Sequence, residues 1–267
     1  MDPMMRYFEL TEDPFSISPD PRYFFMSPYH KGIIAKVDHV VNRKQGLTCI
    51  FGDIGLGKTT LARILMERLK ANNNHVIFLT NPSYKSEMHM VKAISGEFGI
   101  PPKRSLHAQM GAIKAHLTDM YAQELSPVII LDEAQLLKGQ QFEVLRQFSN
   151  FETHDTKLLQ MVLVGQTELR NKLRLKKALA SRIAVYSNLQ PLSPYEMADM
   201  IAFRLAIAGG DSDIFNETSL ERLFEISKGI PREAIKICSV AMELTLANKT
   251  HVVTSEIIET AALEVQL

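Results

Sequence analysis

Short apolar runs alternate with helical stretches between residues 46 and 190. The runs are 47–51 (LTCIF), 75–80 (HVIFLT), 127–132 (PVIILD), 158–165 (LLQMVLVG) and 183–189 (IAVYSNL). They are too short for buried helices and rich in strand-forming residues, whereas the segments between them have helical spacing. Unbroken apolar strands are typical of a parallel sheet covered on both faces. We therefore predict an α/β core over 46–190 with a five-stranded parallel sheet.

The pattern changes after residue 190. Ser193, Pro194 and Glu196 form a capping box with proline in the first turn, which predicts a helix start. Further helices are predicted at 217–228, 231–248 and 254–264, and the first of these is expected to open with a box from Thr218 to Glu221. The strand pattern does not return, so 191–267 is predicted to be a small all-helical domain. Residues 1–45 precede the core as an aromatic N-terminal segment.

Composition agrees with a folded globular protein. Of the 267 residues, 46% are hydrophobic and 22% are charged, which argues against wholesale disorder. The longest apolar runs are far shorter than the roughly 18 residues of a membrane span, and the N-terminus lacks a secretory h-region, so a cytoplasmic protein without a span is expected. Basic and acidic residues number 30 each, so any nucleic-acid contact needs a local patch. Cys49 and Cys238 are predicted to be buried small residues.

Residues 52–60 read GDIGLGKTT, which satisfies the phosphate-loop pattern G-x-x-x-x-G-K-[ST]. Glycines at these spacings let successive backbone N–H groups converge on a phosphate, the lysine adds a positive charge, and the hydroxyl of Thr59 ligates magnesium. A predicted strand precedes the loop and an amphipathic helix follows it, as the motif requires. The predicted nucleotide-binding residues are Gly52, Asp53, Ile54, Gly55, Leu56, Gly57, Lys58, Thr59 and Thr60.

A pair of carboxylates ends the third predicted strand. Asp132 in this position would hold Mg²⁺, and Glu133 can orient or deprotonate an attacking water. A solvated acidic turn is the alternative interpretation. A glutamate available to activate water favours hydrolysis over phosphoryl transfer to a second small substrate.

Two arginines bear on how hydrolysis is controlled. Arg232 begins a helix of the small domain, where it could reach the γ-phosphate. Arg182 lies just before the last core strand, a position expected to project toward a neighbouring copy. An arginine that stabilises phosphate charge is worth roughly 10³ to 10⁵ in rate, so supplying it from another subunit makes hydrolysis depend on assembly. Arg182 as a surface residue of a basic helix is the alternative, and Arg174 is the next candidate.

The motifs GDIGLGKT, VIILDEAQ, LVGQTEL, LASRI and GIPR occur in this order. Together they resemble the AAA+ ATPases of the group that contains the ExeA (general secretion pathway A) proteins and the transposition ATPases TniB, TnsC and MuB. The opening YFELTEDPFSISPDPRYFFMSPYHKG is similar to the N-terminus of the ExeA type. The resemblance covers essentially the whole chain and implies a P-loop AAA+ core with a C-terminal helical lid, binding ATP and Mg²⁺.

The resemblance also implies roles for individual residues. It places Lys58 at phosphate, Thr59 and Asp132 at Mg²⁺, Glu133 as catalytic base, Gln166 as sensor 1, Arg182 as arginine finger and Arg232 as sensor 2. Sensor 1 is more often Asn or Thr in the superfamily, so Thr167 stays an alternative to Gln166. Asn81 matches a polar residue that restrains the glutamate. The aromatic residues Phe15, Tyr23, Phe24 and Phe25 either wall the adenine pocket or form a strap packed on the core.

Two functions follow from the resemblance. ExeA-type proteins couple the ATPase to a transmembrane helix, whereas the transposition ATPases are soluble and assemble on duplex DNA. The chain ends at Leu267, directly after the last predicted helix, which favours the DNA function unless the sequence is truncated. Lys85, Lys103, Arg104 and Ser105 are the expected contacts to DNA backbone. The basic run 170–182, with Arg170, Arg174 and Lys177 on one helical face, is assigned to assembly.

The sequence thus predicts an oligomeric ATPase, either a hexameric ring or a helical filament. It would bind duplex DNA non-specifically when loaded with ATP and regulate DNA transposition by recruiting a transposase, with hydrolysis triggering disassembly. The alternative is the cytoplasmic ATPase of a type II secretion or pilus-assembly system that acts through a protein partner. A third option, a relative of replication initiators or clamp loaders, would need a DNA-reading domain after the lid.

Overall fold

A parallel five-stranded sheet forms the centre of one part of the chain. The computed structural model describes residues 3–17 and 20–265. The strands are β1 (Leu47–Phe51), β2 (Asn74–Leu79), β3 (Ser126–Leu131), β4 (Gln160–Gly165) and β5 (Ile183–Asn188). They run in the order β2-β3-β4-β1-β5, with every neighbouring pair parallel. The predicted sheet is confirmed, with β1 at the predicted bounds and the other strand ends within two residues of the predicted ones.

The chain divides into two compact units. We call 28–53 together with 61–189 the core unit, and 1–27, 54–60 and 190–267 together the helical unit. The single expected segment 1–45 is divided in the structure, because 1–27 groups with the helical unit and Pro28 begins a helix of the core unit. Most of the phosphate loop groups with the helical unit, although Gly52 and Asp53 continue directly from β1 in the core unit.

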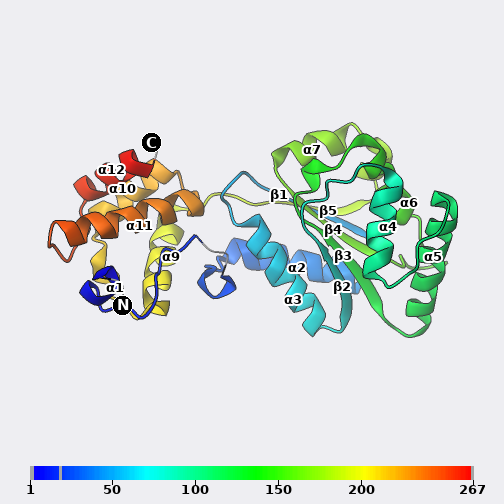
Figure 1. Cartoon of the computed structure of the whole chain (residues 1–267), viewed down its shortest axis with the longest axis horizontal. Helices are drawn as coiled ribbons and strands as arrows, with labels where there is room; N and C mark the ends of the chain where they lie inside the picture. The colour runs from blue at the N-terminus through cyan, green and yellow to red at the C-terminus, as the bar shows by residue number, and fades with distance from the viewer. Residues whose placement is uncertain (1–2, 18–19, 266–267) are drawn as a thin grey trace. The chain divides into compact units, whose positions relative to one another are not determined.

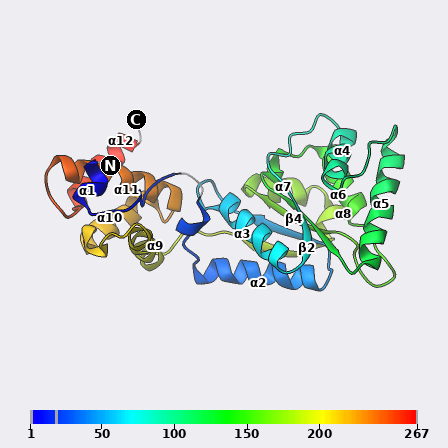
Figure 2. The same ribbon diagram turned by 60° about the horizontal axis from the view of Figure 1, so that its bottom comes forward.

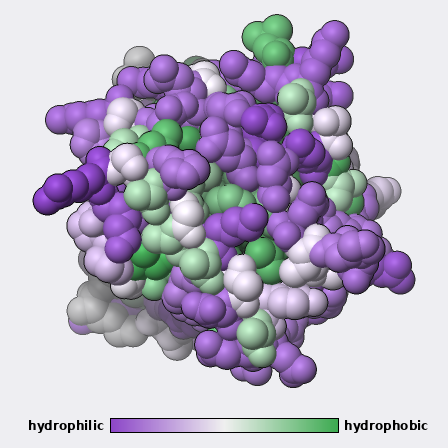
Figure 3. Space-filling model, turned by 90° about the vertical axis from the view of Figure 1, so that its right-hand side faces the viewer, coloured by the Kyte–Doolittle hydropathy of each residue, from purple (hydrophilic) through white to green (hydrophobic). Residues whose placement is uncertain are grey.

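Helices cover both faces of the sheet in the core unit. They are α2 (Pro28–Asn42), α3 (Lys58–Ala71), α4 (Glu87–Glu97), α5 (Leu106–Ala122), η2 (Ala134–Leu136), α6 (Gly139–Phe148), α7 (Thr167–Arg174) and α8 (Lys177–Ala180). Figures 1 and 2 show α2 and α3 on one face and α4 and α6 on the other. Helices on both faces bury β1 and β4 along their whole length, which explains why both strands are mostly apolar. The face beside α5 is mainly hydrophilic, with small separate hydrophobic areas (Figure 3).

The helical unit contains α1 (Pro3–Tyr7), η1 (Pro21–Tyr23), α9 (Pro194–Ile207), η3 (Ser212–Ile214), α10 (Glu217–Ser227), α11 (Pro231–Ala247) and α12 (Ser255–Val265). The predicted capping box of α9 is confirmed, because Ser193 accepts from the Glu196 N–H and Glu196 reaches back to the Ser193 N–H. The predicted cap of α10 is wrong. Asn216 caps this helix through its side-chain oxygen, which accepts from the Ser219 N–H at 2.9 Å.

Apolar side chains of the N-terminal residues complete the core of the helical unit. Met4, Phe8, Leu10 and Phe15 are buried there together with side chains of α9, α10, α11 and α12. Phe15 meets Phe215 edge to face, with ring centroids 5.7 Å apart. This packing supports the interpretation of Phe15 as part of a packed strap. The strap packs on the helical unit, however, and not on the core unit as expected.

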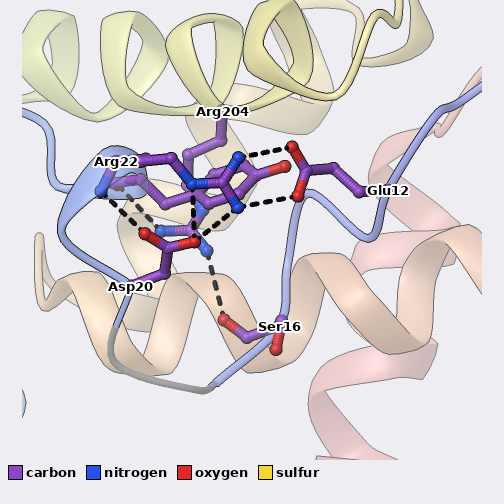
Figure 4. A network of polar contacts seen from close by, with 6 residues as sticks. Glu12, Ser16, Asp20, Arg22 and Arg204 are labelled. Atoms are coloured by element: carbon purple, nitrogen blue, oxygen red, sulfur yellow. Dashed lines mark hydrogen bonds and ion pairs between the residues drawn. The ribbon is translucent and has the colours of Figure 1, made fainter.

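Arg204 of α9 holds the arm, which we define as residues 12–24 without the undescribed 18 and 19. The side chain is 6% exposed and donates to the carbonyl oxygens of Pro14 (2.6 Å), Tyr23 (3.0 Å) and Ser16 (3.2 Å). Its guanidinium also lies 4.8 Å from the centre of the Tyr23 ring. Burial lowers the pKa of Arg204 from its ordinary value. One buried cation therefore fixes the path of the arm (Figure 4).

Arg22 forms a second, exposed set of contacts on the arm. It makes paired hydrogen bonds to the Glu12 carboxylate at 3.1 and 3.0 Å and approaches Asp20 at 2.7 Å. The side-chain hydrogen bond from Arg22 lowers the pKa of Asp20 below its usual range. These pairs join the two ends of the arm, as Figure 4 shows.

Both cysteines are buried free thiols, as predicted. Burial raises the pKa of each. In the part of the chain that the structure describes, none of the helices combines the length and the apolar character that a membrane crossing requires.

Candidate nucleotide site

The phosphate loop occupies the strand–loop–helix context that its motif predicts. It leaves the carboxyl end of β1 and leads into α3, which begins at Lys58. Gly55 and Gly57 have φ angles of +86° and +83°, a backbone conformation that favours glycine. The loop thus directs N–H groups at the amino end of a helix, where the helix dipole favours a bound anion. Lys58 is 6% exposed and lies at this end.

Two other segments of the helical unit contact this loop. The Gly55 carbonyl accepts a hydrogen bond from the Arg232 N–H at 3.2 Å, and a Cβ on Gly55 would lie 2.8 Å from Ile230 Cγ2. A Cβ on Gly57 would lie 3.0 Å from the Phe24 ring. The start of α11 and one aromatic residue of the N-terminal segment therefore both pack against the loop. Of the predicted aromatic residues, Phe24 is the one with this position.

Asp132 and Glu133 follow β3 directly. Asp132 is 2% exposed, its N–H donates to the Leu79 carbonyl at 2.9 Å, and its carboxylate accepts from the Glu133 N–H at 2.9 Å. Glu133 has a φ of +55°, a left-handed conformation that is uncommon for a residue with a side chain. This turn brings the half-buried Glu133 out of the line of the strand at the carboxyl edge of the sheet.

Gln135 connects the ends of β3 and β4. Its Nε2 donates to Glu133 Oε2 at 2.6 Å, and its Oε1 accepts from the Gln166 N–H at 3.0 Å. No role is predicted for Gln135 from the sequence, although this residue ends the VIILDEAQ motif. An amide two residues after the predicted base is the signal that could have identified it.

A further contact joins the end of β4 to the beginning of the phosphate loop. Thr167 Oγ1 donates to Asp53 Oδ1 at 2.6 Å. The predicted sensor Gln166 contacts Gln135 through its backbone N–H, whereas the alternative, Thr167, contacts Asp53 through its side-chain hydroxyl. Asn81 is exposed, with a φ of +51°. Among the described residues, Gln135 hydrogen-bonds to the Glu133 carboxylate and Asn81 does not.

Arg182 immediately precedes β5 and so lies at the amino end of the parallel strands, whereas Glu133 follows the carboxyl end of β3. The register through β4 and β1 places Leu131 level with Tyr186. Because a register shift pairs Ile183 with Leu47, Arg182 lies about three rungs, or about 10 Å, below that level. Three strand spacings of about 14 Å in total separate β3 from β5. The arginine is half-buried, and its Nε has no hydrogen-bond partner within the described residues. It stands near Glu152, whose pKa is lowered chiefly by a hydrogen bond from Lys157 and to a smaller extent by Arg182.

The predicted DNA contacts lie on exposed segments. Lys85, Lys103 and Arg104 have exposed side chains. Ser105 has a structural task, because its hydroxyl caps α5 by accepting from the Ala108 N–H at 3.2 Å. In the basic run 170–182, Arg174 and Lys177 are exposed as well.

Comparisons with known proteins agree with this architecture. Residues 41–173 match the family described as AAA domain. The chain is 36% identical to the General secretion pathway protein A of Aeromonas hydrophila over 264 residues, which is 97% of this chain and 48% of that protein. The chain thus spans about half the length of this relative.

Solved structures show the same fold. The Aeropyrum pernix ORC2 protein is 18% identical with a TM-score of 0.67, over 96% of this chain and 72% of that one. Cdc6p from Pyrobaculum aerophilum is 18% identical with a TM-score of 0.70, over 96% and 71%. The Thermotoga maritima RuvB Holliday junction branch migration motor is 20% identical with a TM-score of 0.56, over 86% and 67%. The chain therefore has the fold of the P-loop AAA+ nucleoside triphosphatases, with an ExeA-like sequence.

Proposed function

We propose that this chain is a magnesium-dependent ATPase whose catalytic site is completed by a second copy, and that it acts in a secretion pathway through a protein partner. The observation that carries the proposal is the position of two residues at opposite ends of the parallel strands. Glu133 follows the carboxyl end of β3, and Arg182 precedes the amino end of β5. About 10 Å along the strands and about 14 Å across them separate Arg182 from Leu131 at the end of β3 by about 17 Å, which an arginine side chain does not span. Arg182 can therefore assist hydrolysis only in the site of a neighbour.

The residues present fit ATP and magnesium. The Thr59 hydroxyl and the Asp132 carboxylate are the hard oxygen ligands that Mg²⁺ prefers, usually with water and substrate phosphates completing its shell. When bound, the ion neutralises charge on the phosphate oxygens. In the proposal Lys58 and the loop N–H groups bind the phosphates, and Glu133 accepts a proton from the attacking water.

The remaining predicted residues surround this chemistry. Arg182 of the neighbouring copy stabilises the charge that develops on the γ-phosphate. Arg232 and Gln166 are proposed to respond to that phosphate as sensors 2 and 1, and the contact of Arg232 with Gly55 supports the first of these roles. Phe24 is proposed to border the nucleotide, because it packs on the loop at Gly57.

Charge is distributed unequally between the two units. By sequence the helical unit has 9 basic and 17 acidic residues, whereas the core unit has 21 basic and 13 acidic ones. Net charges of opposite sign favour an assembly in which the core unit of one copy meets the helical unit of the next. Assembly is therefore expected to weaken as salt concentration rises.

The secretion pathway is supported by the similarity to General secretion pathway protein A, which extends over nearly the whole chain. The expected preference for DNA transposition rested on the end of the chain at Leu267. That argument does not hold, because the chain corresponds to only half of this relative. We therefore place the secretion role first, with a pilus-assembly role as its variant.

DNA binding is the second candidate function, and the positive net charge of the core unit favours it. Exposed Lys85, Lys103 and Arg104 would contact phosphates independently of base sequence, in a transposition role that includes a transposase partner. Fluorescence anisotropy with labelled duplex DNA at increasing salt tests this function. Binding that needs ATP and is lost in a K103A/R104A variant would support it, and absence of binding at low salt would refute it.

A mixing experiment tests the shared catalytic site. Glu133→Gln removes the proposed base, and Arg182→Ala removes the proposed arginine finger. Each variant alone should hydrolyse ATP at a small fraction of the parental rate. In an equal mixture, about a quarter of randomly formed seams join an intact Glu133 to an intact Arg182, so the rate should recover to about a quarter of the parental value.

Lys36→Ala provides the matched control, because it removes an exposed positive charge of the core unit, on α2, at a residue with no proposed role in assembly or catalysis. This variant should retain the parental rate. A mixture that stays as inactive as its two components, or an R182A protein that turns over ATP at the parental rate, would refute the shared site.

A further inference from the structure

We propose that Gln135 is the positioning residue of the reaction, because its side-chain amide holds the Glu133 carboxylate at a fixed place relative to the end of β4. The inference rests on the proposed function, in which Glu133 is the base. In this inference Gln135 neither binds the nucleotide nor transfers a proton, and it acts only by holding Glu133.

The hydrogen-bond pattern fixes the orientation of the Gln135 amide. On one side the Gln166 N–H can only donate, so the atom facing it must be Oε1. On the other side the ionised Glu133 carboxylate can only accept, so the atom facing it must be Nε2. Turning the amide over would place two donors together and two acceptors together. The side chain is therefore held in one orientation by two independent contacts.

The surroundings also fix where the amide lies. Gln135 is 9% exposed. A Cβ on Gly165 would lie 2.8 Å from Gln135 Oε1, so the glycine leaves the space that the amide occupies. Lys172 of α7 donates from Nζ to the backbone carbonyls of Gln135 and Leu137, the latter at 3.2 Å, and so ties the η2 turn to α7. The Gln135 side chain therefore projects from the η2 turn, whose backbone is held by Lys172.

This arrangement has a chemical consequence for Glu133. A carboxylate on a left-handed residue at the end of a strand has several rotamers, and a general base works only within hydrogen-bond reach of its water. The amide occupies one carboxylate oxygen, Oε2, and leaves Oε1 for the water. Because Gln135 also contacts the Gln166 backbone, a displacement at the end of β4 would move the base.

Gln135→Glu tests the donor half of the contact. The new carboxylate can still accept from the Gln166 N–H, but it repels Glu133 where the amide donated. We expect kcat for ATP hydrolysis to fall at least about tenfold, while KM and the affinity for a fluorescent ATP analogue stay within about twofold. Gln140→Glu is the matched control, because it places the same charge on an exposed residue of α6 and should keep the parental kcat.

Gly165→Ala tests the position of the amide without changing its chemistry. The added methyl group would lie 2.8 Å from Gln135 Oε1 and 2.9 Å from Leu169 Cδ2, so it should displace the amide and lower kcat as Q135E does. Thermal melting and analogue binding show whether this variant folds, and Q135E gives the same test without added volume. If Q135E keeps the parental kcat, the inference is refuted, whatever G165A shows.

A double-mutant cycle separates positioning from a general structural effect. If Gln135 acts through Glu133, adding Q135E to an E133Q protein should change the residual rate by less than about twofold. A further tenfold loss in that background would refute the inference. An E133Q protein that hydrolyses ATP at the parental rate would refute the proposed base and this inference with it, whereas an inactive E133Q with a fully active Q135E would refute this inference alone.

Discussion

Replacement of Arg204 by methionine should release the arm from the helical unit. The guanidinium donates to three backbone carbonyl groups at 2.6–3.2 Å and lies over the Tyr23 ring. Methionine fills part of the same volume but offers no donor. We therefore expect both a less stable helical unit and a more open arm.

The magnitude follows from these contacts. Three hydrogen bonds from a charged donor contribute roughly 1.5–3 kcal/mol each, and the ring contact adds about 1 kcal/mol. Burying the guanidinium costs several kcal/mol, which offsets more than half of that gain. The net loss in the free energy of unfolding for R204M should be about 3 kcal/mol. R204K should lie between the two proteins, because an ammonium group does not reach all three carbonyls.

Urea denaturation followed by circular dichroism measures the stability, and hydrogen exchange of the amides in 20–24 measures the opening of the arm. Arg222→Met is the control, since its ion pairs with Glu225 and Glu259 are exposed and contribute little. The control should unfold close to the parental midpoint. An R204M protein with both the parental midpoint and parental exchange protection at 20–24 would refute the assignment of Arg204 as the anchor of the arm.

Two further predictions concern local electrostatics and capping. Asn216→Ala should lower the free energy of unfolding by about 1 kcal/mol in urea denaturation, because Asn216 is the residue that caps α10. Thr218→Ala should lower it by less than half as much. Equal losses for the two variants would contradict this assignment. The lowered pKa of Asp20 means that its contribution to stability is complete above its usual pKa of 3.8 and is lost as pH falls through the folded-state value. The difference in melting temperature between the parent and D20N should therefore shrink from about pH 5 to about pH 3, and a difference that grows over this range would contradict the pairing with Arg22.

The regular parts of the fold could be predicted because their signals are local. Five apolar runs gave five strands, and the GDIGLGKTT loop gave a strand–loop–helix unit whose helix begins at Lys58. The cap of α9 was predicted because Ser193 and Glu196 satisfy each other within four residues. The cap of α10 was missed because Asn216, Thr218 and Glu217 all favour a helix start, and sequence spacing alone does not say which side chain turns to the backbone.

Non-local contacts explain what the sequence did not reveal. From its sequence position Arg204 is an ordinary polar residue of a helix, because its three carbonyl partners on the arm lie 181 to 190 residues earlier in the chain. The position of Phe24 at Gly57 likewise depends on tertiary packing. At the candidate site the carboxylates could be predicted from the strand that precedes them, whereas the role inferred for Gln135 depends on the pairing of β3 with β4.

The proposed shared site would give a row of copies a direction, because Glu133 follows the carboxyl end of β3 and Arg182 precedes the amino end of β5. In an open row of copies, the first and last members differ, because one lacks a donor for its own nucleotide and the other has an arginine that serves no neighbour. A row of n copies then has n − 1 working seams, whereas a closed circle has n. Turnover per copy should rise with the length of an open row and stay constant in a circle, so a plot of specific rate against particle mass would distinguish the two geometries.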